Sequence, residues 1–307
     1  MWASKVLRLP GRDNRRRRLG GGGGLDGGVA AADHHRIARE VKMGFVKTAE
    51  EIARIEAVLR RPRFTGAKRA HLLFLTTEAF VAEVLPPGLA PAEKPLVAVS
   101  VGDYGSNCVG DFAGGSVAIA ARHGEIEAAY VLSMYMTTDH AIVFGRELFG
   151  EPKKQAGIGL SLEGERVRGH VERLGVRLIE LELTLGPDSG PTQNRAATFN
   201  IKALPAADGH GLEGDAVLTL AEFDNDLTVN RRAEGRVKLA GTVHDPLDEI
   251  PIVEVLGGGY IEGDLDARAR AIATIPAADF LPYAYGRLDD WSALDTSGAA
   301  ATSAAAE

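Results

Sequence analysis

Cysteine is almost absent from this chain: of 307 residues, only Cys108 is a cysteine. A single thiol cannot form an internal disulfide, so the fold must depend on packing, and we expect a reducing compartment, the cytoplasm. The position of Cys108 is typical of a small buried hydrophobic residue, with a nucleophile as the alternative. The eight histidines show no metal-ligand spacing. The sequence therefore indicates no metal site, and it holds no nucleotide-cofactor motif.

Long apolar runs and a basic net charge are lacking too. No apolar run approaches the roughly 20 residues that a membrane-spanning helix needs, so we expect a soluble protein with no membrane partner. The formal net charge is −7, which gives no indication of nucleic-acid binding. Hydrophobic residues make up 45% and charged residues 25% of the chain, which is the ordinary balance of a globular protein.

The two ends differ in composition from the rest. Residues 1–42 contain the basic run Arg15–Arg18 and two glycine runs, and they cannot bury enough apolar surface to order themselves. A transit peptide or a nucleic-acid arm are alternatives, but we favour an upstream extension of a chain that starts naturally at Met43. We expect disorder in residues 1–42 and 297–307, and one domain over residues 43–296.

The central part is rich in predicted strands. A helix is predicted from Thr48, its N-cap, to about Arg60, and a shorter one at residues 77–84. Strands are predicted at residues 70–75, 95–101, 117–121, 129–136, 166–171, 176–185, 198–204, 215–220 and 236–239. Glycines 257–259 lack the context of a phosphate-binding loop and predict a turn. This pattern favours a mostly antiparallel β-sheet or barrel with flanking helices, an α+β fold.

The most informative stretch is residues 145–154, GRELFGEPKK, which ends in Lys153 and Lys154. A free lysine amine, with a pKa of about 10, is protonated at neutral pH and is a poor nucleophile. Apolar surroundings or a second cation disfavour the ammonium form, and the neutral amine can then attack a carbonyl to form an imine. Pro152 restricts the backbone before Lys153 and helps to aim it. A lysine pair alone is otherwise typical of a solvated turn.

A strand followed by Gly-Arg-Glu, a short turn and Pro-Lys-Lys resembles the signature of the acetoacetate decarboxylase family. The resemblance spans roughly residues 68–264 and includes the segments Tyr130–Met136, Asn200–Lys202 and Pro246–Glu254. It implies a cone-shaped β-barrel with Lys153 inside its mouth. It also implies a homo-oligomer that acts on a small keto or oxo acid without a cofactor.

The resemblance also implies roles for individual residues. Lys153 is expected to form the Schiff base, and Lys154 to be the neighbouring cation that keeps it partly deprotonated. We interpret Arg146 and Glu147 as a partly buried ion pair that positions the motif, with direct substrate contact as the alternative. The other pocket candidates are Arg69, as the carboxylate-binding arginine, Glu151, where the family can have an aromatic residue, and Asp111.

The chain departs from the family where decarboxylases place two pocket glutamates. Counted back from Lys153, these positions fall near Gly114 and Ser100, and no glutamate occurs there. A carboxylate from elsewhere can replace the lost acid, and a carboxylate within about 5 Å of the Lys153 amine is the expected sign of catalysis. The candidates for it are Asp103, Asp111 and Glu125.

Three hypotheses follow. The first is a carbon–carbon lyase, a decarboxylase that acts on a small β-keto acid through a lysine Schiff base. The second is a Schiff-base aldolase-dehydratase or cyclase that acts on a longer oxo acid. The third is a barrel that binds small molecules without catalysis, against which the intact lysine pair argues.

Overall fold

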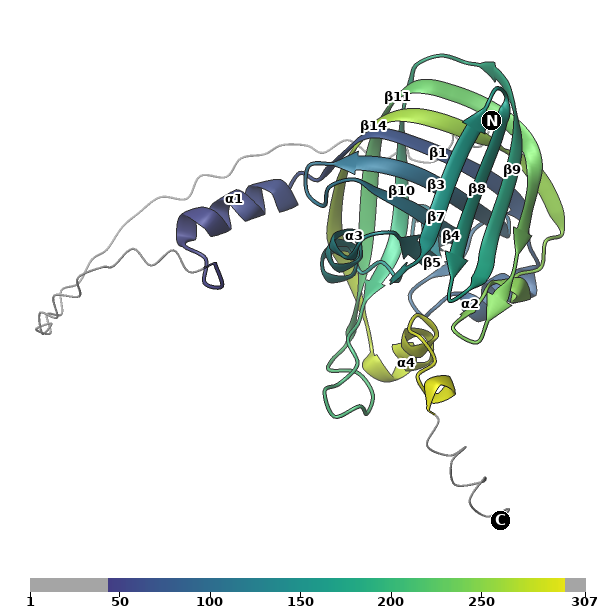
Figure 1. The fold of residues 1–307 in the computed structure, drawn as a ribbon. Helices are drawn as coiled ribbons and strands as arrows, with labels where there is room; N and C mark the ends of the chain where they lie inside the picture. Colours follow the sequence, from purple (N-terminus) through teal and green to yellow (C-terminus); the bar gives the residue numbers. More distant parts are fainter. Residues whose placement is uncertain (1–43, 296–307) are drawn as a thin grey trace, which may run out of the picture.

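The structure, a computed structural model, describes residues 44–295, which form a β-barrel with a second layer of strands (Figure 1). The predictions for residues 1–42 and 297–307 lie outside the described residues. The helices are α1 (Ala49–Leu59), α2 (Glu78–Val84), α3 (Asp139–Phe144), the π-helix η1 (Gly145–Phe149), η2 (Leu247–Glu249), α4 (Ala277–Gly286) and η3 (Ser292–Leu294). The strands are β1 (Arg63–Leu75), β2 (Ala90–Pro91), β3 (Leu96–Ser106), β4 (Phe112–His123), β5 (Ile126–Met136), β6 (Lys153–Gln155), β7 (Gly157–Glu163), β8 (Arg166–Arg173), β9 (Val176–Asp188), β10 (Thr192–Lys202), β11 (Ala216–Leu239), β12 (Gly241–Thr242), β13 (Asp245–Pro246) and β14 (Glu254–Ile275).

Seven strands close the barrel in the order β10-β5-β4-β3-β1-β14-β11, and β11 pairs back with β10. All of these pairings are antiparallel except the short parallel contact between β10 and β5. Closure of the barrel pairs the backbone N–H and C=O groups that the edge strands of an open sheet would leave unpaired. The predicted fold class, a mostly antiparallel β-barrel with few helices, is confirmed.

A second layer covers the outside of the barrel over β3 and β4. Strands β9, β8 and β7 continue from the end of β11, and two glycines allow the close approach of the layers. A Cβ on Gly115 would lie 2.4 Å from Val171 Cγ2, and one on Gly169 would lie 3.0 Å from Val101 Cβ. The larger apolar core fills the space between these layers and continues beneath α2 and α4.

The inner face of the barrel follows from the alternation of side chains. On β11, Glu222 and Asp224 pair with Arg268 of β14 and face solvent, whereas Ala221 and Phe223 face the other way. The latter join a second apolar cluster with residues of β1, β4, β5, β14, α3 and η1. Strands from around a closed barrel can meet in one cluster only inside it. The helical segment α3–η1 therefore plugs the interior.

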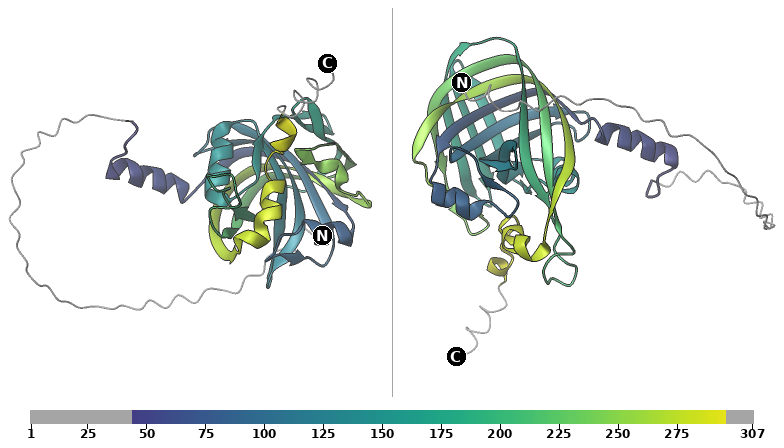
Figure 2. Two further views of the ribbon diagram at one scale, coloured as in Figure 1. Left: turned by 90° about the horizontal axis from the view of Figure 1, so that it is seen from below. Right: turned by 180° about the vertical axis from the view of Figure 1, so that it is seen from behind.

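Helix α1 begins as predicted. Thr48 caps it, and the Thr48 side chain and Glu51 form a capping box. No residue of α1 is buried, so its apolar face, with Ile52 and Ile55, stays exposed. The helix projects away from the barrel in every view (Figures 1 and 2). Within the described residues, no helix is long and apolar enough to cross a membrane.

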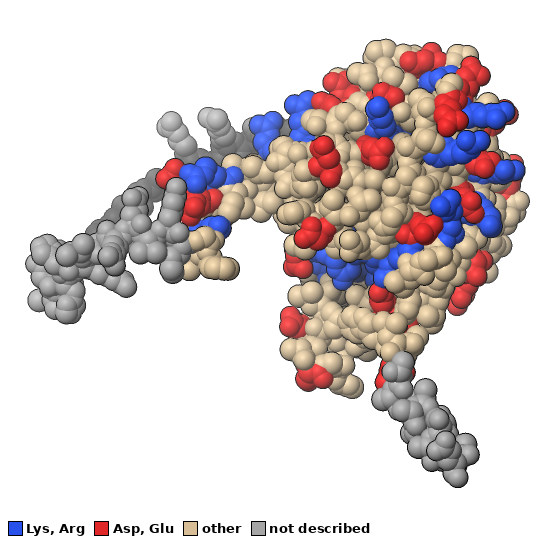
Figure 3. All heavy atoms as spheres, viewed as in Figure 1, with Lys and Arg blue, Asp and Glu red and all other residues tan. Residues whose placement is uncertain are grey.

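Acidic and basic side chains are mixed on the face seen in Figure 3, without a continuous basic area. Several form cross-strand pairs on the outer layer, such as Arg236 with Glu182 and Lys238 with Glu180. Exposed pairs of this kind contribute little to stability. On this face, the charge pattern is that of an ordinary solvated surface.

Two predictions about strands were wrong. The segments 215–220 and 236–239 belong to one strand, the 24-residue β11. Glycines 257–259 do not form a turn but lie within β14. There the backbones of β1 and β14 approach closely: a Cβ on Gly258 would lie 2.1 Å from the His71 carbonyl oxygen. These glycines allow two strands to approach closely. The prediction was wrong because it interpreted them as a turn.

The substitution Gly258→Ala should therefore destabilise the barrel, by about 1–3 kcal/mol in the free energy of unfolding, because an added methyl group collides with backbone. Urea unfolding measures this. Gly286→Ala is the matched control, because no atom lies within 4 Å of its Cβ position. Equal stability of the two variants would contradict the close approach of β1 and β14.

Candidate active site

The candidate site is built around Lys153, the first residue of β6. This strand pairs in parallel with β5, so that Lys153 lies opposite Met134. The Lys153 side chain is only 6% exposed, and its Nζ lies 2.8 Å from Oε2 of Glu151, which is equally buried. Among residues 44–295, Glu151 Oε2 has no hydrogen-bond partner, so the contact is an ion pair without an aligned hydrogen bond. The carboxylate beside Lys153 is thus Glu151, which was not among the three candidates named for that role, Asp103, Asp111 and Glu125.

Two glycines of the motif make this ion pair possible. A Cβ on Gly145 would lie 2.4 Å from both Glu151 Oε2 and Lys153 Cδ, so any side chain there would displace the pair. Gly150 ends the π-helix with a φ of +79°, a left-handed conformation that glycine adopts without strain. The Glu151 N–H then donates to the Gly145 carbonyl at 3.1 Å. The segment from Gly145 to Lys153 thus folds back on itself.

Lys153 belongs to a row of residues that runs along the inner wall. Successive strand pairings place His71, Ser100, Ser116, Met134 and Lys153 side by side on β1, β3, β4, β5 and β6. The hydroxyl oxygens of Ser100 and Ser116 are 2.9 Å apart. The first four residues of the row are partly exposed although they face inward. Lys153 therefore ends a row of inward-facing side chains that are not fully buried.

Arg69 and Tyr104 lie on the same inner face. The Tyr104 ring covers Gly102 and Gly114, where Cβ atoms would lie 3.2–3.5 Å from its carbons. Burial raises the pKa of the Tyr104 hydroxyl, the Arg69 guanidinium counteracts this, and the Glu151 carboxylate adds to the rise. Arg69 and Tyr104 also line a small pocket together with Asn225. Arg69 and Tyr104 thus lie together on the inner face of the barrel, the face to which Lys153 also points.

The two positions that lack the expected glutamates, Ser100 and Gly114, both face the barrel interior. Their register opposite His71 and next to Tyr104 shows that a carboxylate there would point at the same space. This chain instead supplies its buried carboxylate from Glu151, two residues before the lysine.

Lys154 differs from the expectation. Consecutive residues of a strand point to opposite faces, so the Lys154 side chain leaves the interior. Its Nζ binds Asp245 Oδ1 at 2.9 Å, Asp289 Oδ1 at 3.1 Å and the His244 carbonyl oxygen at 2.6 Å. Two carboxylates neutralise this cation, so Lys154 does not stand beside Lys153 as an uncompensated charge.

The remaining predicted residues do not share the barrel interior with Lys153. Arg146 and Glu147 form no ion pair with each other within the described chain: Arg146 Nη1 donates to the Lys153 carbonyl at 3.2 Å, and Glu147 is exposed. Asp111 is exposed at the start of β4, and Glu125 is exposed in the β4–β5 turn. Of the six expected motif and pocket side chains, Arg69 and Glu151 thus share the interior with Lys153.

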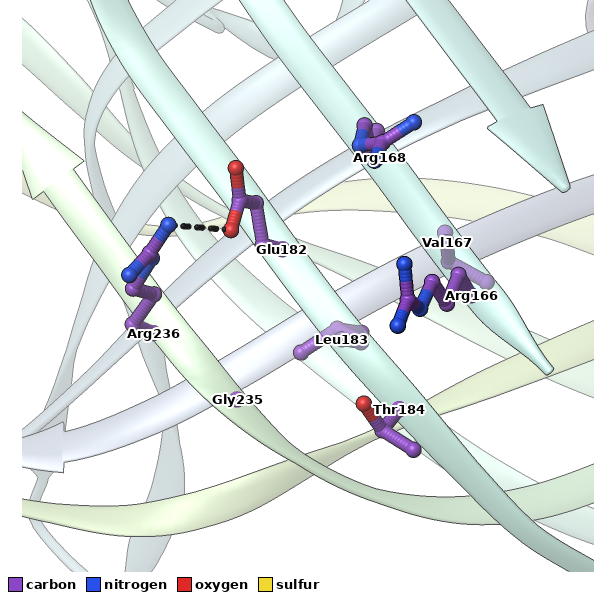
Figure 4. Close-up of a pocket in the computed structure, with 8 residues that line it drawn as sticks. All are labelled: Arg166, Val167, Arg168, Glu182, Leu183, Thr184, Gly235 and Arg236. Atoms are coloured by element: carbon purple, nitrogen blue, oxygen red, sulfur yellow. Dashed lines mark ion pairs between the residues drawn. The ribbon is translucent and has the colours of Figure 1, made fainter. Parts of the chain in front are cut away.

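A surface hollow lies elsewhere, over β8, β9 and β11 (Figure 4). Arg166, Arg168 and Arg236 surround it, and Arg236 pairs with Glu182 at 2.6 Å. These side chains belong to the solvent face of the outer layer, away from Lys153. No group of His, Cys, Asp and Glu side chains in residues 44–295 could hold a metal ion.

Residues 53–274 match the family model described as "Acetoacetate decarboxylase (ADC)". The chain belongs to the acetoacetate decarboxylase family. The acetoacetate decarboxylase of Acidiphilium cryptum is 23% identical over 211 residues, which cover 66% of this chain and 84% of that protein.

Solved structures share the fold. A crystal structure of acetoacetate decarboxylase from Legionella pneumophila superposes with a TM-score of 0.62 at 20% identity, covering 69% of this chain and 87% of that one. The enduracididine biosynthesis enzyme MppR, solved in complex with pyruvate, gives a TM-score of 0.59 at 14% identity, covering 69% and 90%. At these identities the likeness to solved structures shows the fold alone.

The inner-wall histidine gives a prediction about pH. Burial, with a smaller effect of Arg69, lowers the pKa of His71 to about 4 from 6.5. A histidine with a depressed folded-state pKa stabilises the fold above its unfolded pKa and loses that contribution as the pH falls from 6.5 towards 4. Over this range the free energy of unfolding should drop by about 3 kcal/mol more in the wild type than in His71→Gln. Parallel pH profiles from urea unfolding would contradict the lowered pKa of His71 in the folded chain.

Proposed function

We propose that this protein is a carbon–carbon lyase that decarboxylates a small β-keto acid through a Schiff base on Lys153. The observation that carries the proposal is a buried lysine amine with a carboxylate at 2.8 Å on the inner wall of the barrel. An apolar cluster that includes Met136, Phe144 and Phe149 lies in the same barrel interior. An imine is formed and decomposed most effectively in such a site.

The chemistry requires the amine first to lose its proton, and Glu151 Oε2 is placed to accept it. The free electron pair of Lys153 Nζ attacks the substrate carbonyl carbon, and the carbinolamine loses water to give a protonated imine. The bond to the carboxylate then breaks, carbon dioxide leaves, and its electron pair moves into the imine to form an enamine. Protonation of the enamine carbon and hydrolysis release the ketone and the lysine.

Arg69 is the cation available to bind the substrate carboxylate. It lies on the inner face two residues before His71, beside Tyr104, and its strand pairs with β3. A guanidinium presents several donors in a plane, which matches the two oxygens of a carboxylate. A carboxylate held by Arg69 would leave the keto carbon of a β-keto acid, one carbon further along the chain, free to reach Lys153.

The exposed apolar residues of α1 support the inference of a homo-oligomer, because Ile52 and Ile55 are each more than 40% exposed in the single chain. A cytoplasmic location is inferred from the single cysteine. Both inferences are secondary to the proposed reaction and do not affect it.

One observation favours a second function, an imine-forming aldolase-dehydratase. Decarboxylation of an imine needs no base once the imine exists, whereas aldol and dehydration chemistry removes a proton from the carbon next to it. Glu151 lies beside the imine nitrogen and can take that proton. A fold neighbour solved with pyruvate, MppR, is consistent with oxo acids other than β-keto acids. A barrel that only binds is the third candidate.

The first experiment is borohydride trapping with acetoacetate and, separately, with pyruvate. We expect a substrate-sized adduct on Lys153, located by mass spectrometry and absent from Lys153→Ala. Because Lys154 is held by two carboxylates on the other face, it should carry no adduct. Carbon dioxide release then separates the decarboxylase from the aldolase. No adduct with any oxo acid tried would reject imine chemistry and leave the binding barrel.

Glu151→Gln should lower the rate of adduct formation on the order of 10²-fold, because the amine loses its proton acceptor. The matched control is Glu147→Gln, a carboxylate of the same motif that is exposed and forms no ion pair among the described residues. Borohydride added at successive times measures the rate of adduct formation in both variants. A Glu151→Gln variant as fast as the control would show that Glu151 only balances the lysine charge.

A further inference from the structure

The segment that carries both reacting groups has few bonds of its own. Strand β6 has three residues and, in the part of the chain that the structure describes, pairs with the end of β5 alone. Gly150 before it is in a left-handed conformation, and the internal bond from the Lys153 N–H to the Glu151 carbonyl spans only two residues. Within the motif, the Glu151 N–H donates to the Gly145 carbonyl and Arg146 Nη1 donates to the Lys153 carbonyl, so any further hold on residues 150–154 comes from outside the motif. The C-terminal residues Arg287, Leu288 and Asp289 contact this segment at both ends.

Arg287, which follows α4, holds the first end. Its Nη2 donates to the Gly150 carbonyl and its Nη1 to the Ile201 carbonyl, both at 2.5 Å, and its guanidinium lies over the Phe280 ring at 5.8 Å. Burial lowers the pKa of Arg287. No carboxylate of the described chain pairs with this partly buried cation. The two backbone carbonyls, one directly before Glu151, are its hydrogen-bond acceptors.

Leu288 and Asp289 hold the second end. The Leu288 carbonyl accepts from Lys154 Nζ at 3.2 Å, and Asp289 Oδ1 lies 3.1 Å from the same nitrogen. Asp289 Oδ2 binds Arg173 Nη2 of β8 at 2.5 Å. Burial alone would raise the pKa of Asp289, but hydrogen bonds from Arg173 and Lys154 lower it overall. Asp245 contacts the same two cations, so the charges balance within the cluster.

The two lysines of residues 150–154 thus point to opposite faces and make different contacts. Lys153 points into the barrel, while Lys154 is anchored outside, so each anchored contact limits how far the Lys153 backbone can move. The three anchoring residues lie beyond residues 53–274, which match the family model. Their contribution is therefore a property of this chain's C-terminal segment.

We propose that Arg287, Leu288 and Asp289 form a clamp that positions the Glu151–Lys153 pair for imine formation. The clamp acts through the backbone of residues 150–154, so these are positioning residues and do not touch substrate. The proposal rests on the proposed Schiff-base function of Lys153 for its catalytic consequence. Its structural consequence, a fixed segment, is independent of any reaction.

The test uses the full chain with Asp289→Asn and Arg287→Lys, and Asp290→Asn as the matched control. Asp290 is the next carboxylate along, but it binds Ser292 and the Ala293 N–H and does not contact the segment. Two quantities are measured: hydrogen exchange of the peptide 145–155 against a β9 peptide, and the rate of borohydride-trapped adduct as a function of oxo-acid concentration. Asp289→Glu, which keeps the carboxylate, tests rescue.

We expect both clamp variants to speed exchange in residues 145–155 at least about tenfold while β9 is unchanged. The maximal trapping rate should fall on the order of 10- to 100-fold with a nearly constant half-saturating concentration, since misplaced groups react slowly without binding less substrate. Asp289→Glu should recover part of both, and Asp290→Asn should match the wild type.

The proposal is overturned if Asp289→Asn exchanges and reacts like Asp290→Asn, or if β9 exchanges faster to the same extent, which would mean general destabilisation. Should Asp289→Asn fail to fold, Arg287→Lys decides by the same two measurements. A wild type that forms no adduct rejects the Schiff-base function alone, because hydrogen exchange still reports on the clamp.

Discussion

The ion pair between Lys153 and Glu151 is the interaction on which the site depends. Both side chains are 6% exposed, and burying two charges costs several kcal/mol before their attraction is counted. Such a pair is kept only where its short distance is fixed. Gly145 leaves the space for it, and the turn from Gly150 through Pro152 brings the carboxylate back over the amine. The Lys153–Glu151 ion pair therefore requires glycine at positions 145 and 150.

Strand geometry separates the two lysines that the sequence places together. Lys153 faces an apolar interior with one carboxylate, and Lys154 faces a cluster of two carboxylates and a second cation, Arg173. A pair that looks uniform in sequence therefore splits into a reacting group and an anchor. The neighbouring charge that could influence Lys153 most directly is Glu151, at 2.8 Å, rather than Lys154.

The sequence predicted local features well and long-range ones poorly. The Thr48 cap and most barrel strands follow from side-chain type and alternation, which act over a few residues. Strand β14 was missed because its glycines serve close strand approach, which depends on a neighbour almost 190 residues away in sequence. The partners of Lys154 were not predicted either, because Asp245 lies 91 residues away in sequence and reaches Lys154 only in the folded chain.

The position of Glu151 also could not be inferred from residue type alone. Alternation would place it on the Lys153 side of an extended strand, but whether a carboxylate there meets the amine depends on the π-helix and the left-handed Gly150 before it. The sequence motif predicted the reactive lysine, but the backbone conformation between Gly145 and Pro152 determines which side chain contacts it. Tyr104 had no motif at all, and only its register over Gly102 and Gly114 reveals it.

Placing the carboxylate on the same short segment as the amine has a mechanical consequence. A glutamate on β3 or β4 would be fixed to the wall, and movement of the lysine segment would change the distance between acid and amine. With Glu151 two residues from Lys153, both move together, and their 2.8 Å separation survives a shift of the segment. What such a shift changes is the distance from the pair to Arg69 and Tyr104 on the wall. Substrate held at one end by the wall and at the other by the lysine therefore depends on how firmly residues 150–154 are anchored, which gives the contacts of Arg287 and Asp289 their importance.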